Sequence, residues 1–140
     1  MALVPPFSAA TKAASHTTVL IVEDDPFQAN PHREALEKCV RVERAADASE
    51  AFIRIEDPGF RDTLALVVAG LRMPGVAGPA FVSELMARLP LVPILVIGRV
   101  GETARDYPSQ NVSFLPATAS EDELLASVRK ILARRLQRVA

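Results

Sequence analysis

The stretch Leu66-Val67-Val68-Ala69-Gly70-Leu71-Arg72-Met73-Pro74-Gly75 decides the fold of this chain. The residues before Gly70, from Leu64 to Ala69, are all apolar, as in a strand that is covered on both faces. Two further runs, Val19 to Val22 and Ile94–Ile97, have the same character and are rich in β-branched residues. Several short, fully apolar strands of this kind predict a parallel sheet.

Helical patterns lie between these strands and supply the crossovers that parallel strands require. Asp47-Ala48-Ser49-Glu50 is a capping box that opens a short helix, and Asp57-Pro58-Gly59 is expected to stop it. A second helix enters through Gly78-Pro79 and ends at Pro90. The last helix opens with the capping box Ser120-Glu121-Asp122-Glu123 and has apolar residues at helical spacing.

Two segments carry weaker signals. Asn30-Pro31 falls where the first helix should run, so this helix either begins near Pro26 with a distortion or begins with Pro31 at its first position. We favour the first alternative. The segment from Gly101 to Pro108 has poor periodicity, which predicts a fourth helix that is short, distorted or partly absent. Val112–Leu115 then forms a fifth strand. The fold class is therefore α/β, with a doubly wound five-stranded parallel sheet of order 2-1-3-4-5 and helices on both faces.

Composition limits the classes of function. The chain has 140 residues, 49% hydrophobic and 24% charged, which suits one soluble domain. A net charge of -1 provides no global field for nucleic acid or an anionic membrane, and no apolar run reaches the ~20 residues of a membrane span. We expect residues 1–17 to be a disordered leader or linker and residues 18–140 to form the domain. The single cysteine, Cys39, excludes an internal disulfide, and without an export signal the expected compartment is the cytoplasm.

Two stretches together carry a resemblance to a known family. Val19-Leu20-Ile21-Val22-Glu23-Asp24-Asp25-Pro26 and the stretch around Gly70 resemble the receiver domain of bacterial two-component response regulators, the CheY-like fold. Members of that family usually have an aspartate followed by Leu-Arg-Met-Pro-Gly. The resemblance implies that an acidic pair and this aspartate hold Mg²⁺, that the aspartate accepts a phosphoryl group from a histidine kinase, and that a Ser/Thr and a Lys respond to it.

Only part of this chemistry is present in the matching positions. The acidic pair falls on Glu23 and Asp24, with Asp25 just beyond. These acids form either a solvated acidic loop or a residual metal site that holds Mg²⁺ weakly. The reactive groups are missing: the phosphoacceptor position is Gly70, the Ser/Thr position is Gly98 and the Lys position is Ala117. The sequence therefore predicts a pseudo-receiver without a catalytic residue and without a cofactor, with weak Mg²⁺ binding as the open alternative.

Phe114 occupies the position of the aromatic residue that the family uses as a rotating switch. Because Gly98 leaves more room inward, Phe114 is predicted to be fixed in a buried rotamer. A plain core aromatic is the alternative interpretation.

The leading hypothesis is a non-enzymatic receiver domain that acts by phosphorylation-independent protein–protein interaction in two-component signal transduction. The resemblance implies a protein partner such as a histidine kinase or an output domain, bound through the fourth helix, the fifth strand and the last helix, and a homodimer through the same face is compatible with it. The alternative is a module that binds a small ligand or a divalent metal through Glu23, Asp24 and Asp25 in a pocket emptied by the small residues. Whether the chain stands alone or belongs to a larger hybrid kinase or regulator stays open.

Overall fold

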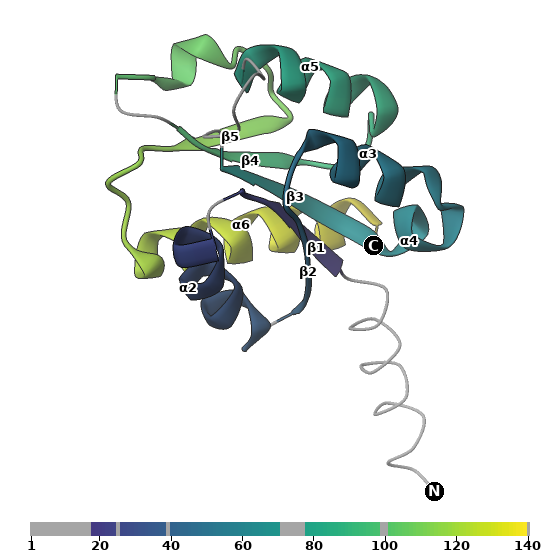
Figure 1. Cartoon of the computed structure of the whole chain (residues 1–140), viewed down its shortest axis with the longest axis horizontal. Coiled ribbons are helices and arrows are strands. Elements are labelled where there is room, and N and C mark those ends of the chain that lie inside the picture. Colours follow the sequence, from purple (N-terminus) through teal and green to yellow (C-terminus); the bar gives the residue numbers. More distant parts are fainter. Residues whose placement is uncertain (1–17, 25, 39, 71–77, 99–100, 140) are drawn as a thin grey trace, which may run out of the picture.

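The computed structural model describes residues 18–24, 26–38, 40–70, 78–98 and 101–139, without the side chains of residues 26–30 and 135–139. Five strands form one parallel sheet in the order β2-β1-β3-β4-β5 (Figure 1). These strands are β1 (Thr18–Val22), β2 (Arg41–Ala45), β3 (Leu64–Gly70), β4 (Ile94–Ile97) and β5 (Val112–Leu115). The predicted fold class and strand order are confirmed.

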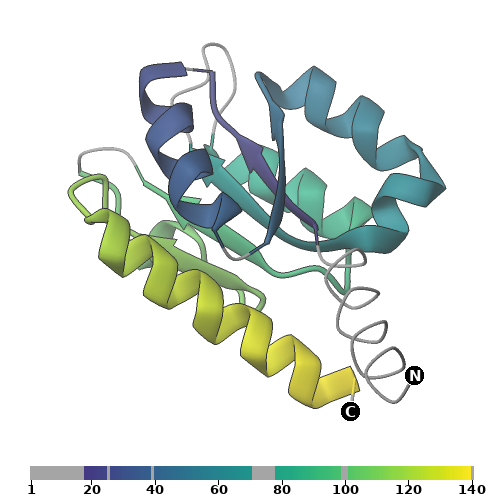
Figure 2. The same ribbon diagram turned by 90° about the horizontal axis from the view of Figure 1, so that it is seen from below.

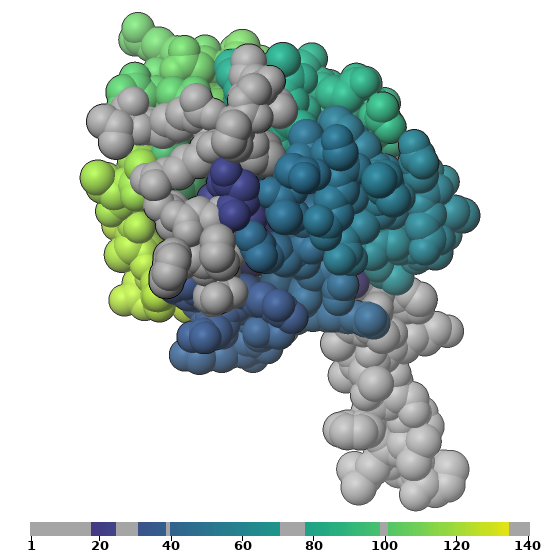
Figure 3. All heavy atoms as spheres, viewed as in Figure 1, coloured from purple at the N-terminus to yellow at the C-terminus, as the bar shows by residue number. Residues whose placement is uncertain are grey.

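Helices cover both faces of this sheet (Figures 1 and 2). One face carries α2 (Pro26–Glu37) and α6 (Glu121–Val139). The other carries α3 (Ala48–Glu56), α4 (Pro58–Thr63) and α5 (Gly78–Arg88), which form a continuous surface in the space-filling view of Figure 3. Every residue of β1 and β3 is buried, because both strands lie between two helical layers.

The core is divided by the sheet into two clusters, and alternate residues of a strand enter opposite clusters. Leu20 and Val67 pack with α3 and α5, whereas Ile21 and Val68 pack with α2 and α6. This alternation explains why the central strands are apolar without interruption.

Most helix boundaries follow the sequence signals. The side chain of Asp47 accepts a hydrogen bond from the backbone N–H of Glu50 at 2.8 Å and caps α3. At the start of α6, the Glu123 N–H donates to Ser120 Oγ at 3.2 Å, and the Ser120 N–H donates to Glu123 Oε1 at 3.3 Å. The predicted capping box of α6 is therefore confirmed, whereas at α3 the Glu50 carboxylate accepts from the Ala46 N–H at 3.3 Å in place of the expected Asp47 N–H. The structure also settles the first helix, since α2 begins at Pro26 and contains Pro31 in its interior.

One helix was not predicted, and one predicted helix is reduced to a short turn. Asp57-Pro58-Gly59 ends α3 as predicted, but it also begins α4, a helix that was not predicted from the sequence. The Asp57 carboxylate accepts from the Gly59 N–H at 2.9 Å, and Pro58 occupies the first helical turn, where its missing N–H costs nothing. The fourth helix is short, as predicted: among the described residues only the 3₁₀ turn η1 (Ala104–Asp106) stands in its place.

Two sequence predictions fall on residues outside the described ranges: the leader at 1–17 and the metal-ligand role of Asp25. The domain boundary at residue 18 therefore stays a prediction. Within the part of the chain that the structure covers, none of the helices has the length and apolar character needed to cross a bilayer.

Candidate functional site

The predicted site residues lie at one edge of the sheet, where the strands end. Glu23 and Asp24 follow β1, Gly70 is the last residue of β3, and Gly98 follows β4. The register pairs Val22 with Ala69 and Gly70 with Ile97, so these strand ends are level with one another. In a doubly wound sheet, ligands bind at this edge, at the point between two strands where the strand order reverses.

Glu23 fills the space beside Gly70. Its side chain is buried, with 2% of the residue exposed. A Cβ atom built on Gly70 would overlap Oε2 of Glu23 and would lie 2.9 Å from its Cδ. The expected vacancy at the phosphoacceptor position is therefore not empty, because a carboxylate of the same chain occupies it.

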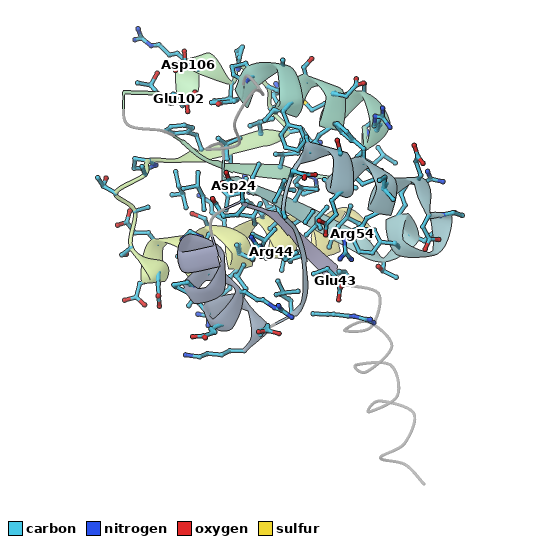
Figure 4. The ribbon with its side chains drawn as sticks, in the orientation of Figure 1. Asp24, Glu43, Arg44, Arg54, Glu102 and Asp106 are labelled. Carbon is cyan, nitrogen blue, oxygen red and sulfur yellow. The ribbon has the colours of Figure 1, made fainter. Side chains whose placement is uncertain are left out.

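Arg44, which no sequence signal singled out, holds the backbone of Glu23. Its Nε and Nη2 donate hydrogen bonds to the Glu23 carbonyl oxygen at 3.1 and 2.8 Å. The Glu23 N–H donates to the carbonyl of Ala45 at 3.1 Å, so both backbone groups of Glu23 are tied to β2. Figure 4 labels Arg44 together with Asp24. In the sequence, Arg44 cannot be told apart from an arginine that is simply exposed to solvent. Its contact with Glu23 could therefore not be predicted.

Asp24 is partly buried, and its Oδ1 atom is buried without a hydrogen-bond partner among the described residues. This oxygen could face a cation. However, the described residues contain no group of three or more His, Cys, Asp or Glu side chains placed to hold a metal ion. Gly70 provides no carboxylate, and the Glu23 carboxylate lies in its place. The described residues therefore do not fit the three-carboxylate Mg²⁺ site that the family implies.

Phe114 fills the corresponding space beside Gly98. A Cβ atom on Gly98 would overlap Cζ and Cε2 of the Phe114 ring. The Phe114 ring is half-buried and stands where a Ser or Thr side chain would otherwise be. That the ring is fixed in this rotamer stays a prediction. Ala117, at the predicted Lys position, lies in the turn after β5 and carries no charge.

A second aromatic residue supports Phe114. The ring of Tyr107 stacks on Phe114 with 5.9 Å between the centroids and 24° between the planes. The Tyr107 hydroxyl donates to Glu102 Oε2 at 3.1 Å, and Tyr107 is 5% exposed. Tyr107 follows η1 directly, so this contact fixes the segment that stands in place of the fourth helix. A cavity of about 260 Å³ lies between α5 and this segment, and its lining includes Val82, Met86 and Tyr107.

Known proteins are similar to this chain in both sequence and fold. The chain is 30% identical over 128 residues to the response regulator Rre1 of Synechocystis sp., a match that covers 86% of this chain and 54% of Rre1. The receiver domain of the hybrid histidine kinase CckA is 27% identical, with a TM-score of 0.66, over 82% of this chain and 98% of that domain. This chain is a response-regulator receiver domain.

Other solved receiver domains agree in fold. A CheY-like receiver domain from Methanospirillum hungatei has a TM-score of 0.73 at 18% identity, over 87% of this chain and 98% of that chain. No protein-family profile matches the chain. The receiver domain spans about half the length of Rre1.

Proposed function

We propose that this receiver domain signals by protein–protein contact without being phosphorylated. The observation that carries the proposal is the occupied position beside Gly70. This residue has no side chain to accept a phosphoryl group, and the space that an aspartate would need contains the buried carboxylate of Glu23.

The surrounding groups support the same conclusion. An acyl phosphate forms only if a carboxylate oxygen can reach the phosphorus of the donor. Glu23 is almost fully buried, so it does not present an oxygen to a donor in solution. Gly98 and Ala117 supply neither the hydroxyl nor the ammonium group that would contact the transferred phosphoryl oxygens. The domain is accordingly proposed to have no enzymatic activity.

The proposed contact surface consists of η1, β5 and α6, and the proposed partner is a histidine kinase or an output domain. Support comes from the Tyr107–Phe114 stack, which joins η1 to β5 in one arrangement. A fixed surface suits recognition by shape, because the partner then binds without a conformational change in this domain. A homodimer through the same face is part of this proposal.

The experiment is incubation of the purified protein with Mg²⁺ and acetyl phosphate, or with beryllofluoride, followed by intact-mass measurement and amide NMR. A receiver domain with an intact aspartate serves as the positive control. We expect no covalent phosphoryl group and no saturable shift of the Gly70 amide. A stoichiometric acyl phosphate on any carboxylate would refute the proposal, and the Glu23→Gln variant would show whether Glu23 carries it.

A weak divalent-cation site is a second candidate, favoured by the buried, unpartnered Oδ1 of Asp24. Two or three carboxylates completed by water hold Mg²⁺ loosely. Titration with Mg²⁺, followed by NMR, tests this candidate in the protein and in the Asp24→Asn variant. A shift of the Asp24 region that saturates in the protein and disappears in Asp24→Asn would support it. Identical titrations would exclude it.

A further inference from the structure

We infer that Glu23 is an internal plug, held by Arg44, that replaces the missing side chain at position 70 and keeps the receiver's reactive pocket closed. This inference rests on the proposed function only in taking that pocket as unused for phosphorylation. It identifies which residues keep the pocket closed and predicts that Glu23 and Gly70 act as a coupled pair.

The steric part of the argument is direct. Any residue larger than glycine at position 70 places its Cβ on the Glu23 carboxylate, so Glu23 must move. Glu23 is 2% exposed and its side chain lies in a packed interior, where a displaced side chain has few alternative positions. Gly70 has no positive φ, so its backbone tolerates a side chain. The carboxylate of Glu23 is therefore the obstacle to a side chain at position 70.

Arg44 holds the backbone from which this carboxylate extends. Two guanidinium N–H groups donate to the Glu23 carbonyl, and the Glu23 N–H is bound to β2. With both backbone groups held, the Cα–Cβ bond of Glu23 has one direction, and the side chain extends from β1 toward the end of β3. Arg44 is thus a positioning residue for the plug.

The plug has a consequence for attempts to restore the reactive site. A carboxylate introduced by Gly70→Asp enters space that Glu23 already occupies, and two carboxylates in contact also repel. Gly70→Asp alone is therefore expected to leave the pocket without a usable divalent-cation site. Shortening Glu23 in the same protein should open the pocket and align three carboxylates at the edge of the sheet.

A double-mutant cycle tests the coupling. Gly70→Ala, Glu23→Ala and the combined variant are compared by urea denaturation. We expect Gly70→Ala to reduce the folded-to-unfolded ratio by about ten-fold or more in the native background, and by no more than about two-fold when Glu23 is alanine. If Gly70→Ala does not fold at all, folding of the combined variant shows the same rescue. Equal effects of Gly70→Ala in both backgrounds would overturn the plug.

Gly98→Ala is the matched control for this cycle, because a Cβ at position 98 meets Phe114 and not Glu23. Glu23→Ala should leave the effect of Gly98→Ala unchanged. Rescue of both glycine variants by Glu23→Ala would mean general loosening of the fold and would also overturn the inference.

The role of Arg44 is tested by repeating the cycle in the Arg44→Met and Arg41→Met backgrounds. Arg41 lies on the same strand, but its exposed side chain is directed to the Glu43 carboxylate, with 4.0 Å between Nε and Oε2. We expect the coupling between positions 23 and 70 to fall at least about three-fold in Arg44→Met and to persist in Arg41→Met. Equal coupling in both backgrounds would remove Arg44 from the plug.

Mg²⁺ titration provides an independent readout. We expect Glu23→Asp combined with Gly70→Asp to bind Mg²⁺ at least about ten-fold more tightly than Gly70→Asp alone, since three hard oxygen ligands then share one edge. Equal affinities would contradict the plug. These outcomes are separate from the proposed function, which is refuted by an acyl phosphate on the unmodified protein.

Discussion

Gly98→Ala is the substitution that most directly perturbs the packing at the end of β4. Its added methyl group would overlap the inward ring of Phe114. Gly98 has no positive φ, so alanine introduces no backbone strain at this position. In the folded state, the effect of the substitution therefore reports mainly the contact with Phe114.

The magnitude follows from the two ways in which the chain can respond. If the ring stays, the overpacked core costs about 1–3 kcal/mol. If the ring rotates outward, the chain loses part of the burial of a half-buried Phe and the Tyr107 stack, which alone contributes about 0.5–1.5 kcal/mol. Both routes give about 2 kcal/mol, a factor of roughly 30 in the unfolding equilibrium. The midpoint of urea unfolding should fall by about 1 M.

Urea denaturation of four proteins measures this effect: the original chain, Gly98→Ala, Phe114→Leu and the combined variant. With the smaller side chain at position 114, the clash is relieved and Gly98→Ala should cost less than about 0.5 kcal/mol, because alanine also restricts the unfolded chain. Aromatic NMR signals report whether Tyr107 and Phe114 stay in contact. A loss of stability that is the same with Phe or Leu at position 114 would show that the ring does not occupy the space beside Gly98.

Three further predictions concern other parts of the fold. Gly101→Ala should lower the free energy of unfolding by about 1 kcal/mol through backbone strain, since Gly101 has φ 91° and an added methyl group would meet no atom within 4 Å. In urea denaturation, Phe114→Leu should not restore this stability. Ser120→Ala should cost about 1 kcal/mol by removing the cap of α6, measured in the same way, and a cost near zero would contradict the capping role. Burial lowers the pKa of His32 below 6.5, and Glu121 partly opposes this. The unfolded chain therefore takes up the proton first, so stability present above pH 6.5 falls as the pH drops through that value. His32→Asn should flatten the dependence of unfolding free energy on pH between about 7.5 and 5.5, and an unchanged slope would count against this cause.

The fold was predictable from the sequence because its signals are local and strong. Uninterrupted apolar runs indicate strands that are covered on both faces, and two capping boxes mark where α3 and α6 begin. The helix α4 was missed because Asp57-Pro58-Gly59 serves as a stop for one helix and as a start for the next. A stop and a start use the same residue types, so the pattern alone does not separate them.

The site was predictable in its missing groups but not in what replaces them. The glycines at positions 70 and 98 are read from the sequence directly. The room that Gly98 leaves for Phe114 could be anticipated as well. The backbone of Glu23 is held by hydrogen bonds from Arg44, which lies 21 residues along the chain. No spacing rule connects these two residues, because their contact follows from the register of β1 with β2.

Both glycines therefore have the same physical consequence. A small residue at the end of a buried strand creates a space, and packed protein interiors do not keep such spaces open. At Gly70 the nearest flexible side chain is an acid, and at Gly98 it is an aromatic ring. At each position a neighbouring side chain therefore lies where the Cβ of a larger residue would be. Reintroducing those side chains one at a time should meet steric resistance, and restoring the pocket requires changes at positions 23 and 114 as well.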